Sequence, residues 1–478
     1  MLELIRDGLW GWPLLALLLF TGILLTLRLR GRHLLALGRA FRYALTDERQ
    51  ADGEISAFGS LCTALSATIG TGNIVGVATA ICTGGPGALF WMLTAALFGM
   101  ATKYAEGLLA VTYRQRDAQG RCLGGPFYYI TGGLGQKFRP LAKLFAVFGV
   151  VAGLFGIGTI VQAHSIVSAV GGFFRNSRFL ILGSHRYPLA QVITGLVITA
   201  AAALVICGGT QRIAGFSEVL VPFMSGGYIL LTLTICFTHR SALPAALRAV
   251  FVGAFSPKAV CGAGSGIGIK LAIQMGVGRG MFSNEAGLGT APIAAAAART
   301  NSPVRQGLVG MLGTFIDTIV LCTLTGLSIL VTGAWQLRSL HGTAVTDYAW
   351  RTGLPWNPEL SSLLLTLCLT FFAFTTIVGW NFYAERCLAY LCRSEALLRL
   401  FRIGYILTVC IGPYLTVSAV WNLADICNAL MAFPNLLALL LLSGTVARES
   451  RTALAPAEKH KKRGTSPKSF RPDNRNVP

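Results

Sequence analysis

The chain has 478 residues, of which 54% are hydrophobic and 12% are charged, whereas soluble globular proteins carry about 25% charged residues. This composition excludes a water-soluble domain and indicates a protein that uses lipid as its solvent. The net charge of +21 would suggest nucleic acid in a soluble protein. The basic residues lie mostly between apolar runs and in the C-terminal stretch, so we expect no nucleic-acid partner.

A transmembrane helix needs about 20 apolar residues. The sequence contains eleven such runs, which predict an all-α integral membrane protein with about 11 spanning helices. The first run is too long for a signal peptide and no small-residue cleavage site follows it. The predicted spans are 9–28, 60–83, 88–112, 143–170, 188–207, 213–237, 270–298, 305–333, 360–388, 400–418 and 425–446.

Basic residues between the spans indicate the orientation. Basic segments follow the first, third, ninth and eleventh spans, and eleven spans place all four on one side. The positive-inside rule makes that side the cytoplasm, so we expect the N-terminus outside and the C-terminus inside a prokaryotic plasma membrane (the inner membrane if Gram-negative). Two basic loops, 175–186 and 240–258, disagree. The polar tail, 448–478, is predicted to be disordered, cytoplasmic and in contact with anionic lipid.

The sequence Gly70-Thr71-Gly72-Asn73 interrupts the second span. Each interior glycine costs about 1 kcal/mol of helix stability relative to alanine. Unpaired backbone at membrane depth is tolerated only where it lines a cavity or is buried in protein. We therefore predict a break that lines a binding site. For Gly76, and for Gly87 in the loop that follows, close helix packing is the favoured interpretation.

The seventh span contains a second interruption. Ser283, Asn284, Glu285, Gly287 and Gly289 lie within an otherwise apolar, alanine-rich stretch. Two interrupted segments in corresponding places of two halves are the sequence sign of a transporter binding site.

Removing the first span leaves ten, which divide into five and five with a broken helix opening each half. An odd number of helices per half makes the repeat inverted. The predicted organisation is an extra N-terminal helix with a basic loop (1–50), a first repeat (51–240), a second repeat (241–447) and the tail (448–478).

The breaks supply the chemistry for binding a zwitterion and a cation. Free amides at a half-helix N-terminus attract a carboxylate, and carbonyls at a half-helix C-terminus attract an ammonium group. A sodium ion prefers oxygen ligands, which backbone carbonyls at the first break and threonine hydroxyls in the ninth span could supply. Each threonine could instead bond its own backbone. The candidates are Gly70, Thr71, Gly72 and Asn73 for the carboxylate, Phe282, Ser283 and Asn284 for the ammonium group, and Ala67, Gly70, Thr375 and Thr376 for sodium.

Three further polar or aromatic residues in the spans have two interpretations each. Gln162 is either a substrate contact or interhelical glue, and Trp380 is either a pocket wall or a packing residue. His164 is either a proton relay or a satisfied core residue.

Three carboxylates are expected inside the membrane. Glu106 is expected to pair with Lys103, one turn before it, and Glu285 to stabilise the free amides of the second break. No role is assigned to Asp317.

Several long motifs resemble the alanine or glycine:cation symporter family over residues 55–447. They are Gly70–Ile81, Gly84–Ala88, Lys103–Glu106, Gly124–Ile130, Ser283–Pro292 and Phe315–Thr318. The resemblance implies a leucine-transporter-type fold and sodium-driven uptake of alanine or glycine, with Gln162 and Trp380 as the pocket glutamine and tryptophan. His164, where the family has asparagine, departs from the pattern.

Other classes of function were weighed against the transporter. An ion channel would require repeated filter loops, and an enzyme would require a nucleophile, base or metal cluster; neither pattern occurs in the sequence, so no catalytic residue is expected. A proton-coupled carrier and a non-transporting sensor on the same fold are the remaining alternatives. The sequence assigns no oligomeric state.

Overall fold

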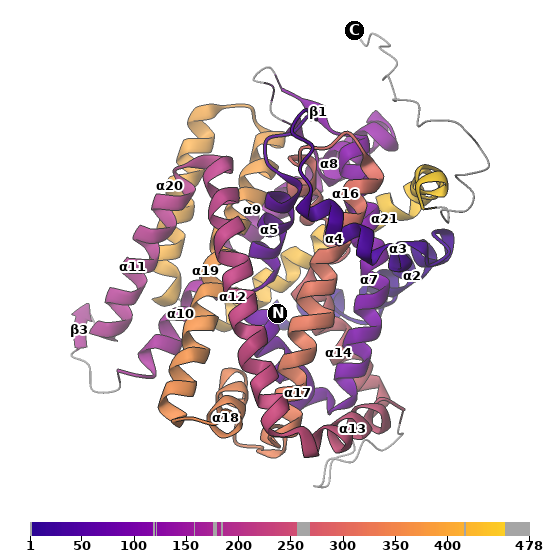
Figure 1. Cartoon of the computed structure of the whole chain (residues 1–478). Coiled ribbons are helices and arrows are strands. Elements are labelled where there is room, and N and C mark those ends of the chain that lie inside the picture. The colour runs from indigo at the N-terminus through magenta and orange to yellow at the C-terminus, as the bar shows by residue number, and fades with distance from the viewer. Residues whose placement is uncertain are drawn as a thin grey trace.

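The computed structural model describes residues 2–117, 120, 122–156, 158–174, 179–182, 185–255, 268–414 and 417–454. The described part is a bundle of helices with two short hairpins (Figure 1). Most of the predicted tail, 455–478, and parts of the two dissenting basic loops lie outside the described residues.

The chain forms its elements in the following order. In the first half these are α1 (Leu2–Leu9), α2 (Trp12–Arg28), α3 (Arg32–Leu35), α4 (Leu37–Leu45), α5 (Ala57–Thr68), the π-helix η1 (Gly72–Gly76), α6 (Val77–Gly84), α7 (Gly87–Thr112), β1 (Gln115–Arg116), β2 (Cys122–Leu123), α8 (Pro126–Gly133), η2 (Gln136–Phe138), α9 (Arg139–Phe155), α10 (Ile160–Gly171), β3 (Phe179–Leu182), β4 (His185–Pro188), α11 (Leu189–Ile206) and α12 (Gly209–Thr238). In the second half they are η3 (Arg240–Ala242), α13 (Leu243–Phe255), α14 (Ile269–Asn284), α15 (Ala291–Ala296), α16 (Pro303–Thr314), the π-helix η4 (Phe315–Cys322), α17 (Thr323–Val331), η5 (Ala334–Gln336), α18 (Thr343–Gly353), α19 (Pro358–Leu391), α20 (Glu395–Ile411), η6 (Gly412–Tyr414) and α21 (Val417–Ala453).

Eight helices of the described chain are long and apolar enough to span a membrane, and a bent pair, Ala57–Thr68 with Gly72–Gly84, makes a ninth. Two of the eleven predicted spans fall short of this criterion. The predicted span 9–28 is α2, which has 17 residues. The predicted span 270–298 is α14 followed by α15, which are separated at residues 285–290. The structure therefore confirms a multi-pass helical protein and leaves the count of eleven as a prediction.

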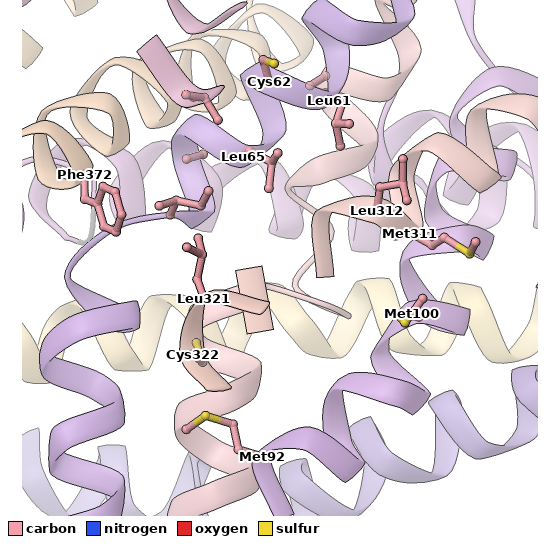
Figure 2. Packing of buried hydrophobic residues seen from close by; sticks show 14 of the residues in the cluster. Leu61, Cys62, Leu65, Met92, Met100, Met311, Leu312, Leu321, Cys322 and Phe372 are labelled. Atoms are coloured by element: carbon pink, nitrogen blue, oxygen red, sulfur yellow. The ribbon is translucent and has the colours of Figure 1, made fainter. Parts of the chain in front are cut away.

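Helix α7 lies at the centre of the packing, against α14 and α16, and α19 packs against α5, α9 and α10. In Figure 2, Leu321 and Cys322 of η4 lie between Leu65 of α5 and Met92 of α7, within the main hydrophobic cluster. The broken helices are thus enclosed by other helices, as unpaired backbone requires in an apolar surrounding.

The two glycines expected to pack closely behave differently. A Cβ atom on Gly87 would lie 2.2 Å from the carbonyl carbon of Gly253, so the prediction for Gly87 is confirmed. At Gly76, in η1 beside the break, nothing lies within 4 Å of an added Cβ atom. The packing prediction for Gly76 is wrong, because the buried glycine leaves open space on the side where a Cβ atom would stand.

The segments that flank the two broken helices meet at one end of the bundle, the end where α4, α8 and β1 lie; α13 and α18 lie at the opposite end (Figure 1). Ile55 and Ala298 form a parallel bridge, with the Glu54 amide donating to Ala297 O at 2.8 Å. Arg386 of α19 pairs with the Glu54 carboxylate at 2.8 Å. We call this bridge together with the Glu54–Arg386 ion pair the clasp.

Candidate functional site

The first broken helix stops at Thr68 and resumes at Gly72, with a bend of 56°. Ile69 is extended, with ψ near 102°, so the helical ladder cannot continue through it. The side chain of Asn73 partly closes the gap, because its Oδ1 accepts from the Gly70 amide at 3.0 Å. The predicted interruption is therefore present, and it lies in the buried interior.

Gly70 faces α10 and α19 at the break. A Cβ atom added to Gly70 would lie 2.7 Å from Thr376 Oγ1 and 3.6 Å from Gln162 Nε2. Thr376 Oγ1 lies 3.2 Å from Ile69 O and 3.0 Å from Phe372 O of its own helix, so its single proton is shared between the unwound backbone and α19. No described residue donates to Gln162 Oε1, although this atom is buried. A buried acceptor without a partner costs about 1–3 kcal/mol, and here it lies beside the break.

Three residues of the second break have a left-handed backbone conformation. The φ angles are 54° at Glu285, 91° at Gly287 and 82° at Gly289, a region that favours glycine. Glu106 of α7 closes this gap, because its Oε1 accepts from the amides of Gly287 and Gly289, both at 3.2 Å. Asn435 of α21 donates to the same oxygen at 2.7 Å.

Two predictions about the carboxylates are corrected by this geometry. Glu106 interacts with Lys103 only through space, and no direct ion pair between them is found within the described chain. The reason is that the amides of the second break take the carboxylate. The Glu285 carboxylate does not accept from those amides. It accepts from Trp380 Nε1 at 3.0 Å and from Thr290 Oγ1 at 2.5 Å.

A polar network joins the two breaks. A Cβ atom on Gly72 would lie 3.3 Å from Ser283 Cα, so the broken helices cross here. Asn73 Nδ2 donates to Asp317 Oδ1 at 2.8 Å, and Ser283 Oγ donates to Asp317 Oδ2 at 3.0 Å. Asn284 is linked to the same network through Thr318 Oγ1 at 3.0 Å. The side chains of Asn73 and Ser283 are therefore engaged by Asp317, a residue to which the sequence assigned no role.

The other expected sodium ligands, Thr375 and Ala67, make fewer contacts with the break than Thr376 does. Thr375 donates to Phe372 O at 2.9 Å and lies 3.7 Å from Met224 Sδ, so its hydroxyl faces α12 and its own helix. Ala67 lies where α19 approaches most closely, since a Cβ atom on Gly379 would be 2.8 Å from the Ala67 amide nitrogen. The structure brings Thr376 to Gly70 and directs Thr375 elsewhere.

Two expected pocket residues and His164 have defined surroundings. Trp380 is fully buried, and its indole N–H donates to the Glu285 carboxylate in the second break. The Phe282 ring lies edge-on to Trp10, with centroids 6.4 Å apart, so it faces the N-terminal helices. His164 Nδ1 lies 3.1 Å from Pro413 O. A carbonyl only accepts, so this bond requires the proton on Nδ1, and the half-buried ring fits a hydrogen-bonded structural residue.

Asn435 was not among the predicted site residues, and Asp317 had no predicted role. A polar side chain within an apolar run is a signal for both. Their partners are distant in the chain, however, because Asn435 bonds Glu106 and Asp317 bonds Asn73. Sequence position alone could not pair them.

A polar cleft of about 1240 Å³ lies beside the clasp. Its basic side chains outnumber its acidic ones. The charged residues that line it are Glu54, Arg116, Asp117, Arg139, Lys143, Glu385, Arg386, Arg393 and Arg402. This cleft is distinct from the buried network at the breaks.

Apolar spanning helices, one of them bent at a buried break, together with a polar centre between two interrupted helices, define a multi-pass membrane protein of the transporter class. The chain belongs to the sodium:alanine symporter family, whose model matches residues 1–469. The family is one of transporters, not of enzymes.

Individual relatives agree with this assignment. An uncharacterised transporter of Haemophilus influenzae is 48% identical over 94% of this chain and 95% of its own. The sodium/alanine symporter AgcS of Methanococcus maripaludis is 43% identical, with the same coverage of 94% and 95%. A probable sodium/glutamine symporter, GlnT of Bacillus subtilis, is 35% identical over 97% of this chain and 91% of its own.

A solved structure shows a related fold. MhsT in complex with L-phenylalanine matches with a TM-score of 0.50 and 12% identity, over 84% of this chain and 93% of that chain. At this identity the likeness concerns the fold alone.

Proposed function

We propose that the protein is a secondary active transporter that uses an inward sodium gradient to take up a small neutral amino acid, alanine or glycine, by alternating access. The observation that carries the proposal is the first break itself. Gly70 lies against Thr376 and against Gln162, whose Oε1 is buried and without a donor among the described residues. This oxygen can accept a hydrogen bond from the ammonium group of an amino acid.

The two breaks offer complementary ends to a zwitterion. Since Asn73 already occupies the Gly70 amide, the amides of Thr71 and Gly72 are the donors we assign to the substrate carboxylate. The ammonium group is assigned to Gln162 and to the carbonyls of Phe282 to Asn284, at the C-terminal end of α14, where the helix dipole is negative. Trp380 forms a wall of the site. An added Gly70 Cβ would lie 2.7 Å from Thr376, so the break has no room for a side chain at this position. The small substrate is proposed from the family, which is that of sodium:alanine symporters.

The sodium ion is cargo in this proposal. We assign it to carbonyls of Ala67 and Gly70 and to the hydroxyl of Thr376, which already reaches Ile69 O. Hydroxyl and carbonyl oxygens are hard ligands that suit a hard cation. Thr375 remains a candidate; both threonine hydroxyls donate to Phe372 O, and only that of Thr376 also reaches the first break.

The proposed transport cycle follows from the predicted inverted repeat of five plus five helices, with α2 as the extra N-terminal helix. The similarity in fold to MhsT supports this arrangement. With the N-terminus outside and the C-terminus in the cytoplasm, the clasp lies at the cytoplasmic end. Alternating access then requires the clasp to open when the opposite end closes.

The test uses the purified protein in liposomes with labelled alanine and glycine. We expect accumulation only with an inward sodium gradient. Uptake driven equally by potassium would contradict sodium coupling, uptake driven by a proton gradient alone would favour the proton-coupled alternative, and no uptake would favour a sensor. Gly72→Leu should abolish uptake in folded protein, because the added Cβ alone would lie 3.3 Å from Ser283.

A further inference from the structure

The segment that joins α2 to the first broken helix carries a concentrated positive charge. No aspartate or glutamate occurs between residues 8 and 46, whereas five arginines lie within residues 28–42. Arg39 donates to Ala453 O, at the end of α21, at 3.1 Å. Within the part of the chain that the structure describes, the other four form no ion pair with an acidic side chain; they are Arg28, Arg30, Arg32 and Arg42.

Helix α4 buries one face and exposes two. It packs against α16 and α5. Phe41 and Leu45 are four residues apart, so they share a face, and they are 40% and 76% exposed. Arg39 and Arg42 are three residues apart and form a second exposed face, which is basic. The buried face consists of alanines spaced by four residues, each at most 4% exposed: Ala36, Ala40 and Ala44.

The exposed apolar side chains adjoin the surface of a spanning helix. The Phe41 ring lies edge-on to the ring of Phe315, with centroids 5.9 Å apart. Phe315 belongs to the segment Pro303–Val331, which is long and apolar enough to cross a membrane. Leu35 of α3, at the edge of the bundle (Figure 1), is 88% exposed. Large apolar side chains in such positions are unfavourable in water.

We propose that α3 and α4, residues 32–45, form an interfacial anchor that binds anionic phospholipid. The exposed apolar side chains enter the acyl layer, and the arginines contact the phosphate groups. Charge complementarity identifies the occupant, because adjoining apolar and basic faces on one helix match a bilayer surface with negative headgroups. A long arginine side chain keeps its stem among apolar groups while its guanidinium reaches the headgroup. The proposal does not depend on which solute the protein carries.

The residues that follow the anchor are bonded to the chain that leaves the second broken helix. Glu48 pairs with Arg305 at 2.8 Å, and Asp47 pairs with Arg299 at 3.4 Å. The Arg299 amide in turn donates to Ile55 O, within the clasp, at 2.8 Å. We therefore expect lipid bound at the anchor to steady the clasp.

The test uses the full chain in liposomes that contain a photoactivatable lipid, either phosphatidylglycerol or phosphatidylcholine, with the reactive group in the acyl chain. Mass spectrometry maps the adducts to the anchor and to α11. Helix α11 carries no charged residue and exposes large apolar side chains, so it is the control for general lipid contact. We expect phosphatidylglycerol to label the anchor about fivefold more than phosphatidylcholine does, and both lipids to label α11 equally.

A double variant tests the role of the arginines. Arg32→Gln with Arg42→Gln removes two of the unpaired charges and should bring the lipid preference of the anchor close to that of α11. Arg393→Gln removes an exposed arginine that lines the cleft beside the clasp; it is the matched control and should keep the preference. Hydrogen–deuterium exchange at the Arg299 amide should be slower in phosphatidylglycerol than in phosphatidylcholine, and this difference should disappear in the double variant.

The comparison of the two lipids is made on the wild type, so it decides the proposal even if the double variant does not fold. Equal labelling of the anchor by the two lipids, or a preference that α11 shares, would overturn the binding of anionic lipid. Absence of adducts on residues 32–45 would overturn it as well and would favour a water-soluble acidic partner. Equal exchange at Arg299 in the two lipids would overturn the link to the clasp.

Discussion

Gly70 is the residue at which the backbone of the first break meets the side chains of two other helices. Its lack of a Cβ atom lets Thr376 and Gln162 approach the unwound chain. Gly76 lies in the same interrupted segment but has no atom within 4 Å of an added Cβ. Comparing substitutions at the two glycines therefore distinguishes crowding at the site from the general effect of replacing a glycine in this segment.

Gly70→Ala is expected to weaken alanine binding, because the new methyl group would lie 2.7 Å from Thr376 Oγ1. Overpacking of this kind costs about 1–3 kcal/mol, or about 5- to 150-fold in affinity. Scintillation proximity binding of labelled alanine measures the change. Gly76→Ala is the matched control and should bind alanine with wild-type affinity. Equal losses in the two variants would show that the effect is not specific to the site.

At the scale of elements, a side chain from outside the gap bonds part of the open backbone of each broken helix. In the first break, the Asn73 side chain, which follows the gap, accepts from the Gly70 amide. In the second break, the Glu106 carboxylate of α7 accepts from the amides of Gly287 and Gly289. Glycine pairs in mid-span were sufficient to predict both breaks, because breaking a helix is a local property. The sequence could not predict Glu106 as the partner of Gly287 and Gly289, because that contact depends on how α7 packs against α14.

The clasp is the element-scale feature that joins the segments flanking the two broken helices at one end of the bundle. The side chains of Arg386 and Glu54 are only 12% and 14% exposed, and the Cys122 amide donates to the same carboxylate at 3.1 Å. Burial raises the pKa of the Cys122 thiol, which lowers its thiolate fraction at neutral pH and so its reactivity.

Glu54→Gln should open this end more often, because it leaves Arg386 without its charged partner. Opening would expose Cys122 and bring its pKa down toward the ordinary value. We expect alkylation of Cys122 by a membrane-impermeant maleimide, followed by mass spectrometry, to rise about tenfold for a loss of about 1.4 kcal/mol. Glu385→Gln removes the separate ion pair with Arg402 and should leave Cys122 protected. Unchanged labelling in Glu54→Gln would contradict the role of the clasp.

At the scale of the whole molecule, composition and hydropathy correctly predicted a multi-pass helical membrane protein, and the motifs correctly predicted its family. The count of spans was harder to predict, since length and hydropathy alone do not identify α2 or the interrupted α14 and α15 as spans. The network around Asp317 was also beyond the sequence, because it depends on three segments that are distant in the chain and meet only in the folded bundle.

In the proposed mechanism, the transported solute bonds the backbone that is left open in the two buried broken helices. A cryo-electron microscopy map of the protein with sodium and L-alanine tests this claim most directly. We predict density for the amino acid between residues 70–72 and Gln162, with its carboxylate toward the first break. A continuous, lipid-facing helix over residues 66–78, or alanine bound only in the cleft beside the clasp, would contradict the account.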